Sequence, residues 1–544
     1  MALILVAVAI YKWMPVGEKV NPLVYFDEFK SNENNLVYED VRIPLKEPVR
    51  MIENSIYVAY DFAKDYISDT IFYDGDEKIL TFTNAREMLR MYPDSDSALL
   101  NFEEITVEEP IKELEGQLYI PAKLIRERYG VEVTSSKNKA LFTADNLALA
   151  KERAVLKRSS SLRTHPQKRS IVLEELKKGE NVIIYKEESD FIRVRSETGI
   201  VGFIPKGDIK DVQQIKAESL EEKQALPIPV PLNEKVNLVW DQMGSKTVGD
   251  WTSSKYANIE QANVISPTWF EFEDESGKLI DRGTKQYVVE AKQRNLQVWP
   301  LISHNFTTPA LTKQILTSTA KRQYMIDQMI QKAEEYGYDG INVDIENIQP
   351  DISEVWVQFM RELYPQLKEA GLVVSVDVYM PSNWSGHYER KKIAQVCDYF
   401  IVMAYDQHWS GSETAGSVSE LPWVEDGIQK NLEEVPKEKL VLGIPFYTRI
   451  WEEREEGLKA TAYGMKPAQD MINRWEATPV LDENSGQNYV EVERNSTVYK
   501  VWIEDSMSIQ KRIDLISQYD LAGYGAWKLG LETPNIWQEL EAVK

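Results

Sequence analysis

The feature that most constrains the fold is a run of alternating segments between residues 235 and 544. Apolar stretches of strand length alternate there with amphipathic stretches of helix length, which end at glycines such as Gly337 and Gly371. Eight strands separated by helices are what a closed (β/α)8 TIM barrel requires, so the predicted fold class is α/β. The candidate strands are residues 236–240, 262–268, 296–303, 338–346, 372–380, 398–406, 439–447 and 521–528.

One connection in this run is much longer than the others. Residues 448–506 separate the seventh and eighth candidate strands and contain strand-like runs at 489–492 and 497–502. Runs of this kind inside a single connection predict a small α+β insertion between strands 7 and 8.

The fourth candidate strand combines an apolar face with an acidic one. Side chains alternate along a strand, so Asn342, Asp344 and Glu346 share one face. Carboxylates two residues apart lie about 6 to 7 Å apart at their Cα atoms, and like charges this close keep one carboxyl protonated. We expect Glu346, at the strand tip, to be a general acid and Asp344 to be its ionised partner. The alternative is that these acids cap the next helix or face solvent.

Residues 339–346 read Asp-Gly-Ile-Asn-Val-Asp-Ile-Glu, which resembles the signature Asp-Gly-x-Asp-x-Asp-x-Glu of glycoside hydrolase family 18. This family comprises chitinases and related N-acetylglucosaminidases. Asn342 stands where the family usually has Asp, and this departure concerns the proton relay behind Asp344. The two carboxylates nearest the chemistry are kept.

The ends of three other candidate strands also resemble family motifs. Met403-Ala404-Tyr405-Asp406 matches Met-x-Tyr-Asp, which implies that Tyr405 bonds the acetamido oxygen of the substrate and that Asp406 holds sugar hydroxyls. Residues 443–449 resemble Gly-x-Pro-x-Tyr-Gly-Arg, with Thr448 in place of the second glycine. Residues 523–527 end at a tryptophan that the family uses as the floor of a sugar subsite. The implied substrate-binding residues are Met403, Asp406, Tyr447, Arg449 and Trp527.

Tryptophans concentrate in the same part of the chain. Thirteen of the fourteen lie between Trp240 and Trp537, and aromatic faces stack on the apolar faces of sugar rings. We expect Trp240 and Trp269 to join Trp527 at the cleft. Trp384 and Trp409 are weaker candidates on loops, and Trp299 and Trp356 are expected in the core.

The family resemblance also implies a mechanism that needs no cofactor and no metal. The 2-acetamido oxygen of the substrate attacks the anomeric carbon while Glu346 protonates the leaving oxygen. Asp344 orients the acetamide N–H and steadies the oxazolinium ion, and Tyr405 holds the attacking oxygen in line. The four histidines form no His-Glu-x-x-His pair, so a zinc protease site is not supported.

An N-terminal region of residues 20–150 contains a weak internal repeat. Residues 56–67 align with residues 118–129, which predicts a strand, a helix and a second strand in each copy. The repeat resembles the N-terminal domain of copper amine oxidases, an α+β stalk-like module, although nothing in it suggests copper.

Short strands and turns fill residues 153–212, a pattern typical of a small β-barrel. Their glycine and apolar spacing resembles bacterial SH3 domains. Contact with cell-wall peptides and a role as a spacer are both open. Prolines at positions 227, 229 and 231 then indicate an extended linker within residues 213–234, ahead of the barrel at residues 235–544.

The start of the chain and its charge bear on location and partners. Residues 1–19 are hydrophobic, and we interpret them as the remnant of a signal-anchor, with a buried N-terminal strand as the alternative. This interpretation predicts an extracellular or cell-surface protein. The net charge of −24 argues against nucleic acid or an anionic membrane as the main partner.

The predicted function is hydrolysis of β-1,4 bonds in glycans that contain N-acetylglucosamine, with bacterial peptidoglycan as the leading substrate. The preference for peptidoglycan depends on the accessory modules. Chitin is the alternative substrate. A carbohydrate-binding protein without catalysis, built on the same barrel, is the alternative class.

Overall fold

The computed structural model describes residues 17–30, 33–137, 140–218, 232, 234–257, 259 and 261–543. The chain divides into two compact units at Leu226 and Pro227, and residues 83–88 group with the second unit. Most of the predicted signal-anchor remnant and of the predicted linker lies outside the described residues. In the described part of the chain, no helix is both long and apolar enough to cross a membrane.

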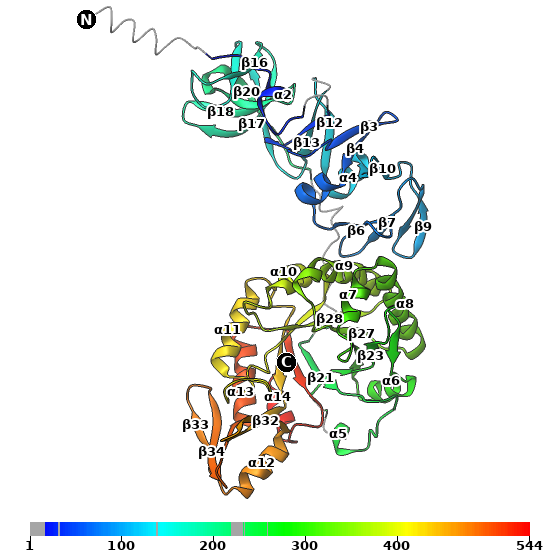
Figure 1. The fold of residues 1–544 in the computed structure, drawn as a ribbon, viewed down its shortest axis with the longest axis vertical. Coiled ribbons are helices and arrows are strands. Elements are labelled where there is room, and N and C mark those ends of the chain that lie inside the picture. The colour runs from blue at the N-terminus through cyan, green and yellow to red at the C-terminus, as the bar shows by residue number, and fades with distance from the viewer. Residues whose placement is uncertain are drawn as a thin grey trace, which may run out of the picture. The chain divides into compact units, whose positions relative to one another are not determined.

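The second unit is built on a closed barrel of eight parallel strands, as predicted (Figure 1). The third strand is in two pieces, of which β25 pairs with β22 while β26 pairs with β27. The break falls at Pro300, which has no N–H to give to a neighbouring strand. The strands are β21 (Val236–Asp241), β22 (Val264–Pro267), β25 (Gln297–Val298) with β26 (Leu301–Ser303), β27 (Gly340–Asp344), β28 (Val373–Tyr379), β29 (Tyr399–Met403), β30 (Leu440–Pro445) and β36 (Gly523–Trp527).

Helices surround the strands, and sequence signals set their ends. Ser318 caps the N-terminus of α8 with its side chain, and Gly337, at φ 78°, ends this helix in the left-handed region. The barrel helices are α6 (Lys285–Lys292), α7 (Ala310–Leu316), α8 (Thr319–Tyr336), α9 (Ser353–Glu369), α10 (Arg390–Ile393), α11 (Leu421–Leu432), α13 (Ser506–Gln518) and α14 (Ile536–Leu540), with α5 (Ser254–Ala257) in the first loop and β23 (Phe270–Phe272) and β24 (Leu279–Asp281) in the second.

The alternation of side chains along the strands produces two cores. Ile341 and Val343 point outward and pack with the helices in the large outer cluster. A smaller cluster fills the inside of the barrel, and its members include Leu238, Trp240 and Trp299. Trp299 stacks on Tyr399 there with ring centroids 5.5 Å apart. The inside is therefore packed, and polar chemistry is confined to the C-terminal ends of the strands.

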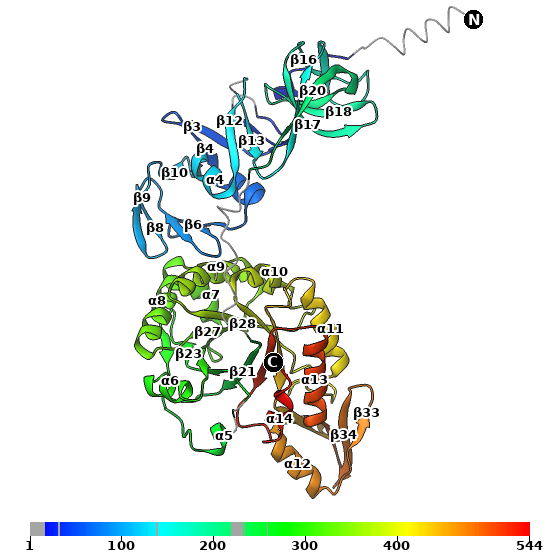
Figure 2. The same ribbon diagram turned by 180° about the vertical axis from the view of Figure 1, so that it is seen from behind.

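An additional sheet and helix lie between the seventh and eighth strands, beside α13 (Figure 2). The sheet has the strand order β32-β31-β35-β34-β33. Its elements are β31 (Tyr447–Arg454), β32 (Gly457–Gly464), α12 (Met465–Arg474), β33 (Val480–Asp482), β34 (Gln487–Arg494) and β35 (Thr497–Ile503). These elements form the insertion sheet.

The first unit is rich in strands and contains both copies of the predicted repeat. In each copy a strand leads into a helical segment, β4 into α3 and β11 into α4, and the two strands pair antiparallel. The elements are α2 (Pro22–Tyr25), β1 (Asn35–Tyr38), β2 (Val41–Arg42), β3 (Val49–Ile52), β4 (Ser55–Ala59), α3 (Tyr60–Phe62), β5 (Ile71–Asp74), β6 (Ile79–Thr83), β7 (Met88–Met91), β8 (Ser97–Leu100), β9 (Glu103–Thr106), β10 (Lys112–Leu114), β11 (Gln117–Pro121), α4 (Ala122–Tyr129), β12 (Val131–Ser135) and β13 (Leu141–Asn146).

The remainder of this unit is one seven-stranded sheet, in the order β16-β15-β19-β18-β17-β14-β20. Every pairing in it is antiparallel, in agreement with the short-strand pattern of the sequence. The strands are β14 (Lys151–Leu156), β15 (Ser160–Arg163), β16 (Val172–Leu176), β17 (Asn181–Glu188), β18 (Phe191–Ser196), β19 (Val201–Pro205) and β20 (Ile209–Ile215), so the last strand extends beyond residue 212.

Candidate active site

The predicted acid lies in the turn that follows β27. The strand ends at Asp344, two residues earlier than predicted, so Glu346 belongs to the turn. Backbone contacts hold this turn from two sides. The N–H of Glu346 lies 3.3 Å from Nδ1 of His304, and its carbonyl accepts a hydrogen bond from the hydroxyl of Tyr388. Asp344 and Glu346 both line a cleft of about 610 Å³.

Both carboxyls are surrounded by groups that disfavour charge. Burial raises the pKa of Glu346, and Asp406 adds to that rise, whereas a hydrogen bond from Tyr379 opposes it. Burial also raises the pKa of Asp344 well above its usual range, with further repulsion from Glu346 and Asp377. Oδ1 of Asp344 is buried and has no hydrogen-bond partner among the described residues. Burial and the two neighbouring carboxyls therefore favour the protonated form of Asp344, whereas the sequence predicted an ionised one.

Asn342 is fully buried, and all the hydrogen bonds that its amide can make are made. Its Oδ1 accepts from Nε1 of Trp240 at 2.8 Å and from Oγ of Ser266 at 3.2 Å. Its Nδ2 donates to Oγ of Ser375 at 3.0 Å and to Oδ1 of Asp377 at 2.8 Å. The residue that departs from the family signature thus connects three strands below the cleft.

The end of β29 and the start of β31 bring a second polar group to the site. Asp406 is exposed and accepts hydrogen bonds at Oδ1 from the hydroxyl of Tyr447 at 2.7 Å and from Nη2 of Arg449 at 2.8 Å. Thr448, which replaces the family's glycine, donates its hydroxyl to the carbonyl of Trp502 in the insertion sheet. The carboxylate of Asp406 is therefore held in place by two side chains of one strand.

Tyr405 and Met403 reach the site from the same strand end. Tyr405 is partly exposed, and its ring packs edge-to-face on Tyr447 with centroids 6.3 Å apart. Burial, together with the charges of Asp377 and Asp344, raises the pKa of the Tyr405 hydroxyl well above its usual range. This hydroxyl is thus kept as a neutral donor. Met403, the last residue of β29, is 7 % exposed.

Trp527 lies between two hollows. It lines the cleft that contains the acids and also a second hollow of about 320 Å³, which Asp406, Arg449 and residues of β32 line. Trp240 lies beneath it, with ring centroids 5.8 Å apart, and is 1 % exposed. Trp240 therefore supports Trp527 and Asn342 from below, whereas the sequence placed it at the cleft surface.

The structure places Trp269 away from the cleft. It is fully buried in the outer core, where its ring packs edge-to-face on Tyr287, Tyr336 and Tyr338. The prediction that it binds substrate is therefore wrong, because the chain turns outward after β22 and carries the ring beneath the helices. The exposed aromatic residue of this cleft is Phe306, at 62 % exposure, while Trp384 and Trp409 are also exposed.

Four residues of the site were not singled out from the sequence. Tyr379 hydrogen-bonds the carboxyl of Glu346, and Tyr388 and His304 hold the backbone of the acid. Burial lowers the pKa of His304 to about 4, so its ring is neutral and can accept the N–H of Glu346. Asp377 is 3 % exposed. The available signal was the alternation of Ser375, Asp377 and Tyr379 along β28, the same period that revealed the acids of β27.

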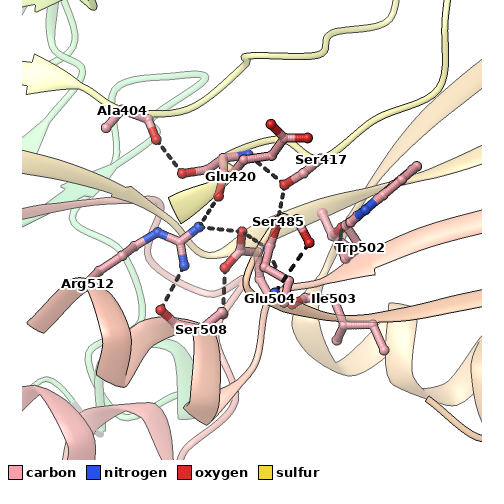
Figure 3. Close-up of polar contacts among 12 residues, drawn as sticks. Ala404, Ser417, Glu420, Ser485, Trp502, Ile503, Glu504, Ser508 and Arg512 are labelled. Carbon is pink, nitrogen blue, oxygen red and sulfur yellow. Dashed lines mark hydrogen bonds and ion pairs between the residues drawn. The ribbon is translucent and has the colours of Figure 1, made fainter. Parts of the chain in front are cut away.

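A buried network fixes the loop that follows Asp406 (Figure 3). Arg512 of α13 forms a 2.9 Å ion pair with Glu504, and it also donates to the carbonyls of Ser508 and Ser419. The hydroxyl of Ser419 in turn donates to the carbonyl of Ala404, next to Tyr405, at 2.6 Å. The insertion sheet and α13 therefore hold the segment that carries Tyr405 and Asp406.

Within the described part of the chain, no group of three or more His, Cys, Asp or Glu side chains could hold a metal ion. The site instead offers a buried acid with a raised pKa, a buried carboxyl with an unpartnered oxygen, a neutral tyrosine donor and an aromatic floor. Such a set, at the C-terminal end of a TIM barrel, defines a glycosidase.

The match to known proteins gives the family. Glycosyl hydrolases family 18 matches residues 243–532, and the chain belongs to this family. The copper amine oxidase N-terminal domain matches residues 37–143, which confirms the resemblance of the repeat.

Relatives include glycosylases of Bacillus subtilis (strain 168). The uncharacterized glycosylase YvbX is 28 % identical over 313 residues, which cover 54 % of this chain and 89 % of YvbX. The cortical fragment-lytic enzyme is 26 % identical over 245 residues, 42 % of this chain and 54 % of its own length. The crystal structure of the spore cortex-lytic enzyme SleL of Bacillus megaterium QM B1551 shares the fold, with a TM-score of 0.51, 21 % identity and coverage of 58 % of this chain and 75 % of that one.

Proposed function

We propose that this glycosidase hydrolyses β-1,4 bonds next to N-acetylglucosamine in bacterial peptidoglycan, by a substrate-assisted mechanism that retains the anomeric configuration. The observation that carries the proposal is the unpartnered Oδ1 of Asp344, buried in the wall of the cleft that Glu346 also lines. A buried acceptor without a donor costs free energy unless the ligand supplies that donor. The acetamide N–H of N-acetylglucosamine is such a donor.

In the first step the acetamido oxygen attacks the anomeric carbon, and the bond to the leaving oxygen breaks as that oxygen takes the proton of Glu346. Tyr405 donates its hydroxyl to the attacking oxygen. Asp344 accepts the acetamide N–H at Oδ1, and the negative charge of the acid cluster to which Asp344 belongs stabilises the oxazolinium cation. In the second step Glu346, now a carboxylate, takes a proton from the water that attacks the anomeric carbon. The bond between that carbon and the acetamido oxygen breaks, which opens the oxazolinium ring and restores the acetamide.

Two cations favour peptidoglycan over chitin. Arg282 lines the first hollow and Lys528 lines the second. Arg282 pairs with Glu271 at 2.8 Å through Nη2, and its other guanidinium donors make no hydrogen bond among the described residues. The muramic acid units of peptidoglycan carry carboxylates, whereas chitin is uncharged. The relatives that act on spore cortex, by their names, point to the same substrate.

The test is the release of reducing ends from purified peptidoglycan and from chitin oligomers, with Glu346→Gln as the blank. We expect cleavage of peptidoglycan. Cleavage of chitin oligomers alone would contradict the choice of substrate, and binding of both glycans without any cleavage would establish a carbohydrate-binding protein.

The location belongs to the same proposal. We infer a protein at the cell surface, because the proposed substrate, peptidoglycan, lies outside the membrane. The seven-stranded sheet of the first unit would then act as the SH3-like module that contacts the wall. Fractionation of cells that carry the full-length gene tests this location, and recovery in the cytosol alone would contradict it.

A further inference from the structure

Polar side chains of β27 and of the turn that follows it lie beside polar side chains of β28 at three successive levels. The register pairs Asn342 with Ser375, an offset of 33 residues (375 − 342). The last paired residues are Val343 and Val376; continued beyond them, the same offset sets Asp344 level with Asp377 and Glu346 level with Tyr379. The first level is linked by a 3.0 Å hydrogen bond, and the third by the bond from Tyr379 to Glu346. Neighbouring strands lie about 4.8 Å apart, so the middle level places two carboxyls side by side.

The hydrogen bonds around the middle level are unequal. Asp377 receives a proton donor at 2.8 Å from Nδ2 of Asn342, and it also interacts with the indole N–H of Trp240. Asp344 receives no hydrogen bond at Oδ1. Donors favour the ionised form of a carboxyl, so the negative charge of the pair is favoured on Asp377 and the proton on Asp344.

Asn342 is what allows this division. Its amide oxygen is occupied by Trp240 and Ser266, so only its NH₂ group is turned toward Ser375 and Asp377. A carboxylate at position 342 would have no proton to give to Asp377. The carboxyl that lies next to Asn342 therefore belongs to β28, and it is buried.

We propose that Asp377 is a positioning residue for the hydrolysis: it supplies from β28 the second buried carboxylate of the acid cluster, which β27 lacks at position 342. This inference rests on the proposed function. Asp377 touches no substrate; its charge acts on the proton of Glu346 and, through Asp344, on the cation formed in the first step.

The charges around Asp377 fix the sign of its effect. The groups that act on the cluster are the acids Asp344, Glu346 and Asp406, with hydroxyls of Tyr379, Tyr388 and Tyr405 beside them. A negative charge raises the pKa of a neighbouring carboxyl. Asp377 and Glu346 repel each other, so we expect removal of Asp377 to lower the pKa of Glu346 and to release its proton at a lower pH.

The experiment compares three forms of the full-length protein: the wild type, the single variant Asp377→Asn, and a double variant that combines Asn342→Asp with Asp377→Asn. The double variant is called the exchange. The kcat and KM for a soluble N-acetylglucosamine oligomer are measured against pH, with thermal melting as a check of folding. We expect Asp377→Asn to lower kcat about 100-fold with little change in KM and to move the alkaline limb of kcat down by about one pH unit. The exchange restores the two carboxylates and should recover kcat to within about tenfold of wild type.

Asp398→Asn is the matched control. Asp398 is also buried at a strand of the same barrel, where it pairs with Lys368 at 2.9 Å and accepts from Tyr364. It lies directly before β29, at the N-terminal end of the barrel, whereas Asp377 lies near the C-terminal end of β28. This variant should melt at a lower temperature with an unchanged alkaline limb, which separates lost stability from a lost charge.

Two results would overturn the inference: wild-type kcat and an unmoved alkaline limb in Asp377→Asn, or an exchange variant no more active than the single one. If the single variant Asp377→Asn does not fold, the test depends on the exchange variant only. A kcat of the exchange variant more than 100-fold below that of the wild type then overturns the inference. A wild type that cleaves neither glycan overturns the proposed function first, and this inference with it.

Discussion

Glu346 owes its orientation to residues far away in the sequence. His304, directly after the third strand, accepts the backbone N–H of Glu346. Tyr388 donates to the carbonyl of Glu346, and Tyr379 forms a hydrogen bond with its carboxyl. Because His304 has a pKa of about 4, it stays neutral in the range where glycosidases work and adds no charge of its own. The acid is therefore held by a shell that does not titrate with it.

Glu346→Gln is expected to lower kcat for peptidoglycan at least about 1,000-fold, because the amide cannot protonate the leaving oxygen. The amide has the size of the carboxyl and can keep the contact with Tyr379, so binding should persist. Equilibrium binding of a soluble glycan and single-turnover assays measure the two effects separately. A variant that keeps full activity would exclude Glu346 as the acid.

Arg282→Gln is expected to weaken hydrolysis of peptidoglycan several-fold and to leave chitin oligomers unaffected, because only the first substrate carries carboxylates. The ratio of the two kcat/KM values is the measurement. Lys292→Gln is the control: its side chain pairs with Asp339 and its ammonium donates to the carbonyl of Gly337, at the opposite end of the barrel. Equal losses on both substrates would show that Arg282 serves the fold instead.

The acids were predictable because they occupy one short strand with a period of two. Residues that meet only in the folded barrel were not. Asp377 and Tyr379 lie more than thirty positions beyond the acids, and nothing in their own segment marks them except a polar alternation. The prediction that Trp269 lies at the cleft was wrong because its sequence context is ambiguous. A tryptophan two residues after β22 has the same neighbours in the sequence whether it faces the cleft or the helices.

At the scale of elements, α13 and the insertion sheet act together on β29. The carboxyl of Glu504, directly after β35, accepts hydrogen bonds from Arg512 and Ser508 of α13 and from Gln487 of β34. Despite these donors, burial raises the pKa of Glu504 to about 7. A group with a raised pKa contributes stability at low pH, and this contribution is lost as pH rises through the folded value.

Glu504→Gln is therefore expected to flatten the fall in stability between about pH 4.5 and 7. The difference from wild type across this window is about 3 kcal/mol, from a pKa change of roughly 2.5 units. Urea unfolding at several pH values measures it. Glu456→Gln, at an exposed position between β31 and β32, is the control and should leave the slope unchanged. A wild-type slope in Glu504→Gln would contradict the assignment.

The succession of elements was largely predictable, whereas their interruptions were not. Eight apolar strands separated by glycine-terminated helices leave few alternatives to a barrel, and the long connection before β36 indicated an insertion. The early end of β27 and the break of the third strand at Pro300 depend on which backbone groups find partners in neighbouring strands, and those partners are distant in the chain.

At the scale of the whole molecule, every residue of the candidate site comes from the second unit. Residues 227–544 alone should therefore keep the kcat/KM of the full-length protein for soluble oligomers. Binding to intact cell walls should fall at least about tenfold, because a second attached module raises the effective concentration at a surface. Co-sedimentation with purified walls and the oligomer assay give the two values. Unchanged sedimentation would show that the first unit is a spacer.

The pairing of Asn342 with Asp377 also bears on how related genomes are surveyed. A search that examines strand β27 alone would count this chain as having lost an acid and would sort it with inactive lectins. A search that compares positions 342 and 377 together would find an amide at one and a carboxylate at the other in this chain. Among relatives of this kind, the two positions should vary as a pair, so that an amide at one accompanies a carboxylate at the other.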